Sequence, residues 1–432
     1  MTSPVTFRRN NDSLSIVNCR AVLPGGILEP ARIRIEGGLI TDIGRSSSSS
    51  GPHRTEDCID ARGCLVLPGF VDIHADSLEA AIAPRPSAPF LPETVLPTYE
   101  ASLVMHGITT VFHCVGLADL GDVTKPLRTR DKAREIVGAI RNHQSGSPLR
   151  VRIHLRYEIT DTDSLPLLDS LVEDGEVDMM SLMDHTPGFG VFKDIDAYRE
   201  YHRRSGQSLA AADEKVAALM ERRDQLDEGA LAELVDACHR RGLTVVSHDD
   251  HTVEKLEWAL SLGVSVAEFP VTVEALDFAR GQGMQAVYGT PNLIRGVSHA
   301  GNLRVADMLT TGRVDIFCLD YSPMCSLLAL FTAVELTGSP LAEVSRLFSL
   351  NPARAVGLDT VTGSIEIGKA ADLILVDQRG SRPRLLATIA NGRPVYRAEV
   401  VAAKTEQGKS GHSPVTSVEK SGHDNARGKG KL

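Results

Sequence analysis

Short apolar runs alternate with longer amphipathic stretches through the middle of this chain. The apolar runs are rich in β-branched residues, as buried parallel strands are. Stretches such as 214–240 and 254–262 have the spacing of amphipathic helices. The predicted strands are Val71–His74, Thr109–His113, Val151–Ile159, Met179–His185, Thr244–His248, Ser265–Phe269, Ala286–Tyr288 and Asp315–Leu319. Eight strands separated by helices predict an α/β fold, a TIM-like (β/α)8 barrel.

The two flanks of this region have a different pattern. Residues 14–43 form short β-type runs that are broken by glycines, which predicts hairpins. Residues 363–376 have the pattern of a turn followed by a buried strand. The tail, 402–432, is rich in Lys, Gly, Ser and His and poor in apolar residues, so it is predicted to be disordered.

Composition narrows the class of protein. With 432 residues, 42% hydrophobic and 24% charged, the chain is typical of a soluble globular protein with a large core. A net charge of −10 argues against nucleic-acid binding. The most apolar helical stretch, 324–336, is shorter than the roughly 20 residues that a membrane span needs. Seven cysteines without a C-x-x-C pair, and no apolar N-terminal run, favour reduced thiols in the cytoplasm.

Ionisable side chains stand at the ends of most predicted strands. In a (β/α)8 barrel these ends converge on one mouth, where active sites lie. Imidazoles and carboxylates in such a set suit a divalent metal ion, Zn²⁺ or Mn²⁺, and one or two ions are open at this point. The candidates are His74, Asp76, His113, Glu158, Asp184, His185, His248, Asp250, Glu268 and Asp320.

Several of these residues have a specific reason to be ligands. His74 and Asp76 are two apart on a strand, so their side chains face the same way and could hold one cation. His248 has Asp250 on the same face. Glu158 is predicted to bind metal, with an ion pair to Arg156 as the alternative.

Basic and amide-bearing residues fall in loops that should open at the same mouth. A guanidinium and glycine-freed backbone amides are good phosphate ligands, so these loops favour an anionic substrate. The alternative is a solvated surface loop. The predicted substrate-binding residues are Arg85, His185, Lys193, Arg295, His299 and Asn302.

The motif His74-Ala75-Asp76 resembles the first strand of the amidohydrolase superfamily, with Asp in place of the usual second His. Residues 363–376 resemble its C-terminal signature. The resemblance implies that both chain ends build a small β-sandwich, 12–66 plus 359–400, beside a barrel of residues 67–358. It also implies that Asp320, after an apolar run, is both a metal ligand and the general base. Glu268 stands where most members have a ligand His, and is either a replacement ligand or an acid behind the ligands.

Longer stretches resemble one family more closely: the diphosphatases that act on alpha-D-ribose 1-methylphosphonate 5-triphosphate in phosphonate catabolism. They are residues 74–79, 84–86, 107–112, 181–188, 247–250, 267–270, 291–302 and 320–323. In that family Asp76 is the expected residue. The resemblance implies a metal-dependent hydrolase that converts this small ribose phosphonate to its 5-phosphate and releases pyrophosphate. Tyr157 and His113 depart from the family pattern, and they bear on the substrate if they line the pocket.

Two other functions remain open. One is an amidohydrolase that acts on a cyclic amide or deaminates a base, although such enzymes usually keep the full His-x-His and a strand-six His. The other is a barrel that serves as a non-catalytic component of a phosphonate-cleaving complex. Buried carboxylates without a metal would be destabilising, which argues against the second. Barrels of this kind often form homo-oligomers, and no membrane partner is expected.

Overall fold

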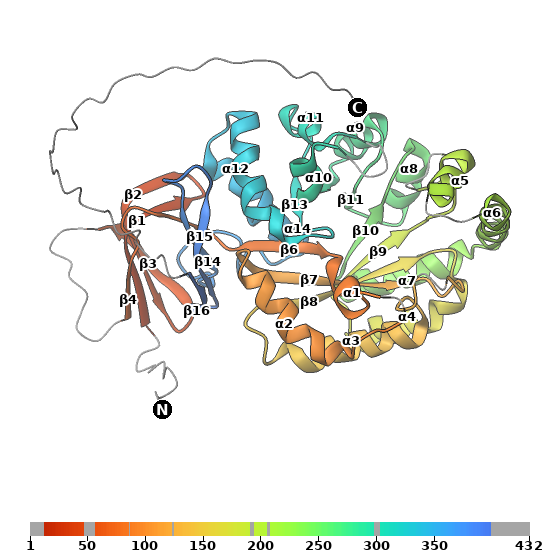
Figure 1. Ribbon diagram of the computed structural model, residues 1–432, viewed down its shortest axis with the longest axis horizontal. Helices are drawn as coiled ribbons and strands as arrows, with labels where there is room; N and C mark the ends of the chain where they lie inside the picture. The colour runs from red at the N-terminus through yellow and green to blue at the C-terminus, as the bar shows by residue number, and fades with distance from the viewer. Residues whose placement is uncertain are drawn as a thin grey trace, which may run out of the picture. The chain divides into compact units, whose positions relative to one another are not determined.

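The computed structural model describes residues 13–46, 57–85, 87–122, 125–190, 194–204, 208–297 and 303–398. Within these residues the strands form two sheets of eight strands each (Figure 1). One sheet is the predicted barrel, and the other is built from both flanks of the chain. The predicted tail, 402–432, lies outside the described residues.

The barrel strands pair in parallel and in sequence order, which confirms all eight predicted strands. Each is buried along its length apart from the first residue of some strands and Arg152 in the third strand, which agrees with helices on the outer face. The strands are β6 (Phe70–Ala75), β7 (Ile108–Leu117), β8 (Arg150–Glu158), β9 (Met179–Met183), β10 (Thr244–His248), β11 (Val266–Glu268), β12 (Gln285–Gly289) and β13 (Ile316–Cys318).

The barrel closes between β6 and β13. Asp320 N–H donates to the carbonyl of His74 at 3.0 Å, and Asp76 N–H donates to the carbonyl of Asp320 at 2.9 Å. The buried carboxylate of Asp72 adds a side-chain link, because its Oδ1 accepts a 2.7 Å hydrogen bond from Leu319 N–H. This closure places the end of the last strand beside the end of the first.

Helices cover the outside of the barrel (Figure 1). The predicted helix 214–240 is two helices, because the chain breaks at 225–227 and Asp227 accepts from Ala230 N–H at 2.9 Å as an N-cap. In the described part of the chain, no helix is long and apolar enough to cross a bilayer. The α-helices are α1 (Ser77–Ile82), α2 (Pro92–Val104), α3 (Arg130–Gln144), α4 (Leu165–Glu173), α5 (Ile195–Arg204), α6 (Leu209–Asp224), α7 (Glu228–Arg240), α8 (Val253–Ser261), α9 (Val273–Gly281), α10 (Thr290–Arg295), α11 (Val305–Thr310), α12 (Ser326–Thr337), α13 (Leu341–Ser345) and α14 (Leu350–Ala355).

The second sheet confirms that the chain ends meet beside the barrel, and its strands are hydrogen-bonded into one continuous, largely antiparallel sheet. Its own hydrophobic core gathers side chains such as Ile16, Ile33 and Leu375. The boundaries drawn at 66 and 359 stay a prediction. The strands are β1 (Ser13–Leu23), β2 (Gly26–Glu36), β3 (Leu39–Arg45), β4 (Asp57–Asp60), β5 (Leu65–Pro68), β14 (Leu373–Asp377), β15 (Arg384–Ala390) and β16 (Arg393–Arg397).

The passage from the second sheet into the barrel is tightly packed at Gly69. A Cβ added there would lie 2.3 Å from the buried side chain of Thr109, so Gly69→Ala should destabilise the fold by roughly 1–3 kcal/mol through overpacking. Gly138 in α3 is the matched control, because no atom lies within 4 Å of an added Cβ. Gly138→Ala should stabilise by up to about 1 kcal/mol. Chemical denaturation of both variants measures this, and equal effects would contradict it.

Candidate active site

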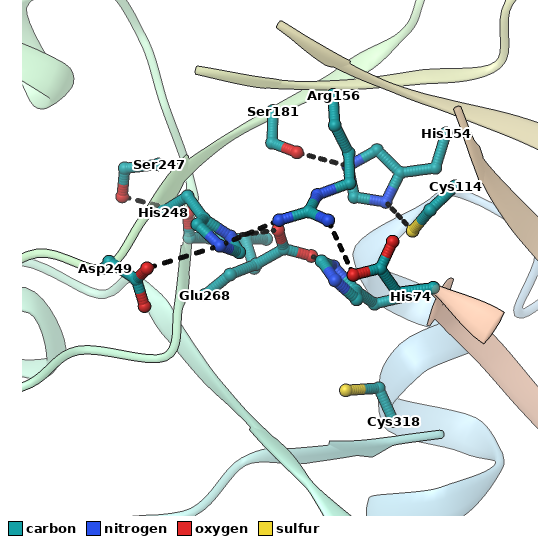
Figure 2. A network of polar contacts seen from close by, with 12 residues as sticks. His74, Cys114, His154, Arg156, Ser181, Ser247, His248, Asp249, Glu268 and Cys318 are labelled. Carbon is teal, nitrogen blue, oxygen red and sulfur yellow. Dashed lines mark hydrogen bonds and ion pairs between the residues drawn. The ribbon is translucent and has the colours of Figure 1, made fainter. Parts of the chain in front are cut away.

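The carboxylate of Glu268, at the end of β11, contacts the imidazoles of His74 and His248, which come from the first and fifth barrel strands. Its Oε1 lies 3.0 Å from His74 Nδ1, and its Oε2 lies 3.3 Å from His248 Nδ1. The two rings are stacked, with centroids 5.6 Å apart, and all three side chains are buried (Figure 2). A carboxylate only accepts, so both imidazoles carry a proton on Nδ1, and His248 keeps a lone pair on Nε2 that accepts from Arg156. Although burial works against the charged form, Cys114 and Glu268 raise the pKa of His74.

Arg156 on β8 is the buried cation of this cluster. Its Nη1 donates to Asp76 Oδ2 at 2.8 Å, and its Nη2 donates to His248 Nε2 at 3.0 Å. Although burial works against the ionised form, the charges of Arg156 and Arg128 lower the pKa of Asp76 to about 2. Burial lowers the pKa of His248, and Arg156 lowers it further. His248 is therefore a neutral imidazole, the form that ligates metals.

Asp320 follows β13 in a left-handed conformation with φ of 54°. Gly289 makes room for its carboxylate, because a Cβ there would lie 2.6 Å from Asp320 Oδ2. Burial raises the pKa of Asp320 to about 6, and the neighbouring charges of Asp76 and Asp249 act in the same direction. A carboxyl with a pKa in this range suits a general base near neutral pH.

Glu158 stands at the predicted strand end, but its carboxylate contacts His185. Its Oε2 lies 2.6 Å from His185 Nδ1, and its Oε1 accepts from His185 N–H at 3.1 Å. The alternative pairing of Glu158 with Arg156 is wrong, because Arg156 pairs with Asp76. Asp184 forms an ion pair with Arg223 of α6. The sequence had given no role to Arg156 in the site, although a charge in a buried strand is a signal for one.

The carboxylate beside His248 is Asp249 and not Asp250. Asp249 Oδ2 lies 3.5 Å from His248 Nε2, whereas Asp250 accepts from Ser247 Oγ at 2.5 Å and pairs with Lys255 at 3.3 Å. The prediction assumed an extended chain, but Asp249 has a φ of 52° and so breaks the alternation of a strand.

The predicted substrate-binding residues divide into three groups. His185 is near the cluster, with its ring centroid 6.1 Å from that of His248. Arg85 is exposed in a loop, and Arg295 is exposed at the end of α10, where its Nη1 donates to Tyr321 OH at 3.0 Å. The others lie outside the described residues: Lys193, His299 and Asn302.

The two departures from the family pattern lie away from this cluster. His113 Nε2 contacts Glu100 of α2 at 3.2 Å, on the outer side of the barrel. Tyr157 is buried, and its hydroxyl donates to the carbonyl of Asp161 at 3.0 Å. The hydrogen-bond partners of both residues, Glu100 and Asp161, lie outside the cluster of His74, His248 and Asp320.

The donor set fits a divalent metal ion. Among the described buried side-chain atoms, Asp76 Oδ1 has no hydrogen-bond partner, and Asp72 Oδ2 has none either. Unpaired buried carboxylate oxygens beside imidazoles are the environment in which a cation is favourable. Three groups of described residues bring ligand atoms within 4.8 Å of one another: His74, His248 and Glu268; His185, His248 and Asp249; and His74, Cys114 and His154.

Comparison with known proteins agrees with this geometry. The model of the Amidohydrolase family matches residues 65–404. This chain belongs to that family. Members of this family are hydrolases and generally use divalent metals, which the donor groups of this site could hold.

Curated relatives include two kinds of enzyme. An alpha-D-ribose 1-methylphosphonate 5-triphosphate diphosphatase of Escherichia coli is 31% identical over 389 residues, which are 88% of this chain and 100% of that protein. A dihydroorotase of Mycobacterium tuberculosis is 25% identical over 409 residues, 83% of this chain and 88% of that protein. Among solved structures, a D-hydantoinase matches 89% of this chain and 95% of its own with a TM-score of 0.61 at 15% identity. The last likeness shows the fold alone.

Asp72 offers a test of the charge balance in this cluster. Burial raises its pKa to about 7 in the folded chain, against about 3.9 in the unfolded chain. Between these values the unfolded chain has lost the proton and the folded chain retains it, so rising pH lowers the free energy of unfolding. Asn does not titrate. In metal-free protein, the thermal midpoint of Asp72→Asn minus that of the wild type should therefore grow from about pH 4 to about pH 7. A difference that is independent of pH would contradict this.

Proposed function

We propose that this chain is a metal-dependent diphosphatase that converts alpha-D-ribose 1-methylphosphonate 5-triphosphate to the 5-phosphate and pyrophosphate. The observation that carries the proposal is the similarity to the Escherichia coli diphosphatase, which extends over the whole length of that protein. The acids at the two positions where amidohydrolases usually have His, Asp76 and Glu268, are consistent with it.

The proposed metal ligands are His74, Asp76 and Asp320, whereas His248, which the sequence predicted as a ligand, has its Nε2 occupied by Arg156. Glu268 acts behind them, since its two oxygens hold the Nδ1 atoms of His74 and His248. A bound Zn²⁺ or Mn²⁺ would supply a Lewis acid and lower the pKa of the attacking water. Glu158, which the sequence suggested as a bridge, instead orients His185.

The chain's own groups would serve the remaining needs of phosphoanhydride hydrolysis. A carboxylate oxygen of Asp320 takes the proton of the attacking water, and its raised pKa keeps that proton transfer favourable. The pyrophosphate that leaves needs positive charge. The described candidates are Arg128, whose charge acts on Asp76, Lys125 in the loop after β7, and Arg295 at the end of α10.

The direct experiment is a pyrophosphate-release assay with Mn²⁺ or Zn²⁺ supplied. We expect a higher kcat/KM for the ribose phosphonate triphosphate than for ATP, and no opening of dihydroorotate. Ring opening of dihydroorotate would favour the amide-hydrolysing alternative, which the similarity to dihydroorotases raises. Absence of any turnover, with no bound metal, would favour the non-catalytic scaffold.

Asp320→Asn should lower kcat for pyrophosphate release by about 10²–10⁴-fold, the usual contribution of a general base. The fold should survive, because Asn tolerates the left-handed conformation and retains the backbone bonds that close the barrel. Steady-state kinetics and thermal unfolding measure the two effects. Near-normal turnover would remove Asp320 as the base.

Arg295→Ala should raise KM for the triphosphate by about tenfold and leave kcat nearly unchanged, because one charge-assisted hydrogen bond is lost in binding. Tyr321→Phe is the matched control, since it removes only the 3.0 Å hydrogen bond to Arg295 and keeps the guanidinium. Equal KM values for Arg295→Ala and the wild type would place triphosphate recognition elsewhere.

A further inference from the structure

Arg156 occupies the space between side chains from the first and fifth barrel strands. It is 5% exposed, and Figure 2 shows its guanidinium reaching toward His248 and its neighbours from the third strand. Its two terminal nitrogens contact Asp76 Oδ2 and His248 Nε2, at 2.8 and 3.0 Å. Both of these atoms belong to residues that could ligate a metal.

A guanidinium excludes a metal ion from the atoms that it holds. It has no lone pair and does not lose its proton in proteins, so it cannot ligate a metal itself. An ion that took Asp76 Oδ2 or His248 Nε2 would have to displace the guanidinium and bring a second positive charge against it. The other oxygen of Asp76, Oδ1, is buried and unpartnered, so one side of the same carboxylate remains for a metal.

The third strand also lacks the group that would bridge two ions. Glu158, two residues after Arg156, has both oxygens in contact with His185. The third strand therefore brings a positive charge into the cluster where a bridging carboxylate would bring a negative one. Arg156 also already supplies positive charge to the carboxylates of the cluster. The acidic side chains of the cluster are Asp76, Asp249, Glu268 and Asp320, and the ion pair of Arg156 is with Asp76.

We propose that Arg156 is a resident cation that takes the place of a second metal ion, so that this chain binds a single divalent ion. The proposal rests on the metal dependence proposed above, but not on the identity of the substrate. A second ion at the atoms that Arg156 holds would bring two positive charges together in a buried site.

The test is metal stoichiometry, measured by elemental analysis after chelation, reloading with Mn²⁺ or Zn²⁺, and dialysis. We expect one tightly bound equivalent in the wild type and two in Arg156→Met, because the substitution frees Asp76 Oδ2 and His248 Nε2. The control is Arg150→Met on the same strand, where Arg150 pairs with Asp372 at 2.7 Å. It removes a similar ion pair and should keep one equivalent.

Each result decides between the proposals. Two equivalents in the wild type, or one in a folded Arg156→Met, would overturn the role of Arg156 and leave the metal dependence intact. No bound metal in the wild type would instead overturn the metal dependence. Calorimetric titration of the wild type gives its stoichiometry even if Arg156→Met does not fold. Added metal should also raise the thermal midpoint of a folded Arg156→Met more than that of Arg150→Met.

Discussion

The contact between β6 and β13 is the constraint on which the site depends. Every other pair of neighbouring barrel strands is joined by one connection along the chain, whereas this pair brings together residues about 245 positions apart. The same residues make the closure and carry the ionisable side chains. The carbonyl of His74 and the N–H of Asp76 both bond to the backbone of Asp320, so closing the barrel also assembles three members of the cluster. Fold and site are therefore stabilised by the same interactions.

Left-handed residues after the strands set the direction of several side chains. Asp249, Phe269 and Asp320 have φ of 52°, 55° and 54°, and each donates its N–H to the next strand, at 2.9, 3.0 and 3.0 Å. Such a conformation costs a non-glycine residue about 1–2 kcal/mol, and these hydrogen bonds offset that cost. The parallel ladder thus extends one residue past the ends of β10 and β11 and two residues past the end of β13, where the chain then turns.

This geometry explains what could be predicted from the sequence. The strands were recognisable because buried strands of a barrel are short apolar runs, and the ligand candidates His74, His248 and Asp320 stand directly at their ends. The directions of side chains beyond those ends could not be predicted, because the alternation of a strand fails at a left-handed residue such as Asp249. The partners of Glu158 were equally inaccessible, since distant segments supply them.

Arg156 gives a physical reason for the aspartate in the His-Ala-Asp motif. A buried guanidinium needs an ionised partner, because leaving it uncompensated would cost several kcal/mol. A neutral imidazole at position 76 could accept a hydrogen bond from Arg156 but could not balance its charge. His248 already makes a neutral contact of that kind, so the compensation has to come from Asp76. The departure from His-x-His on the first strand and the arginine on the third are thus two halves of one buried ion pair.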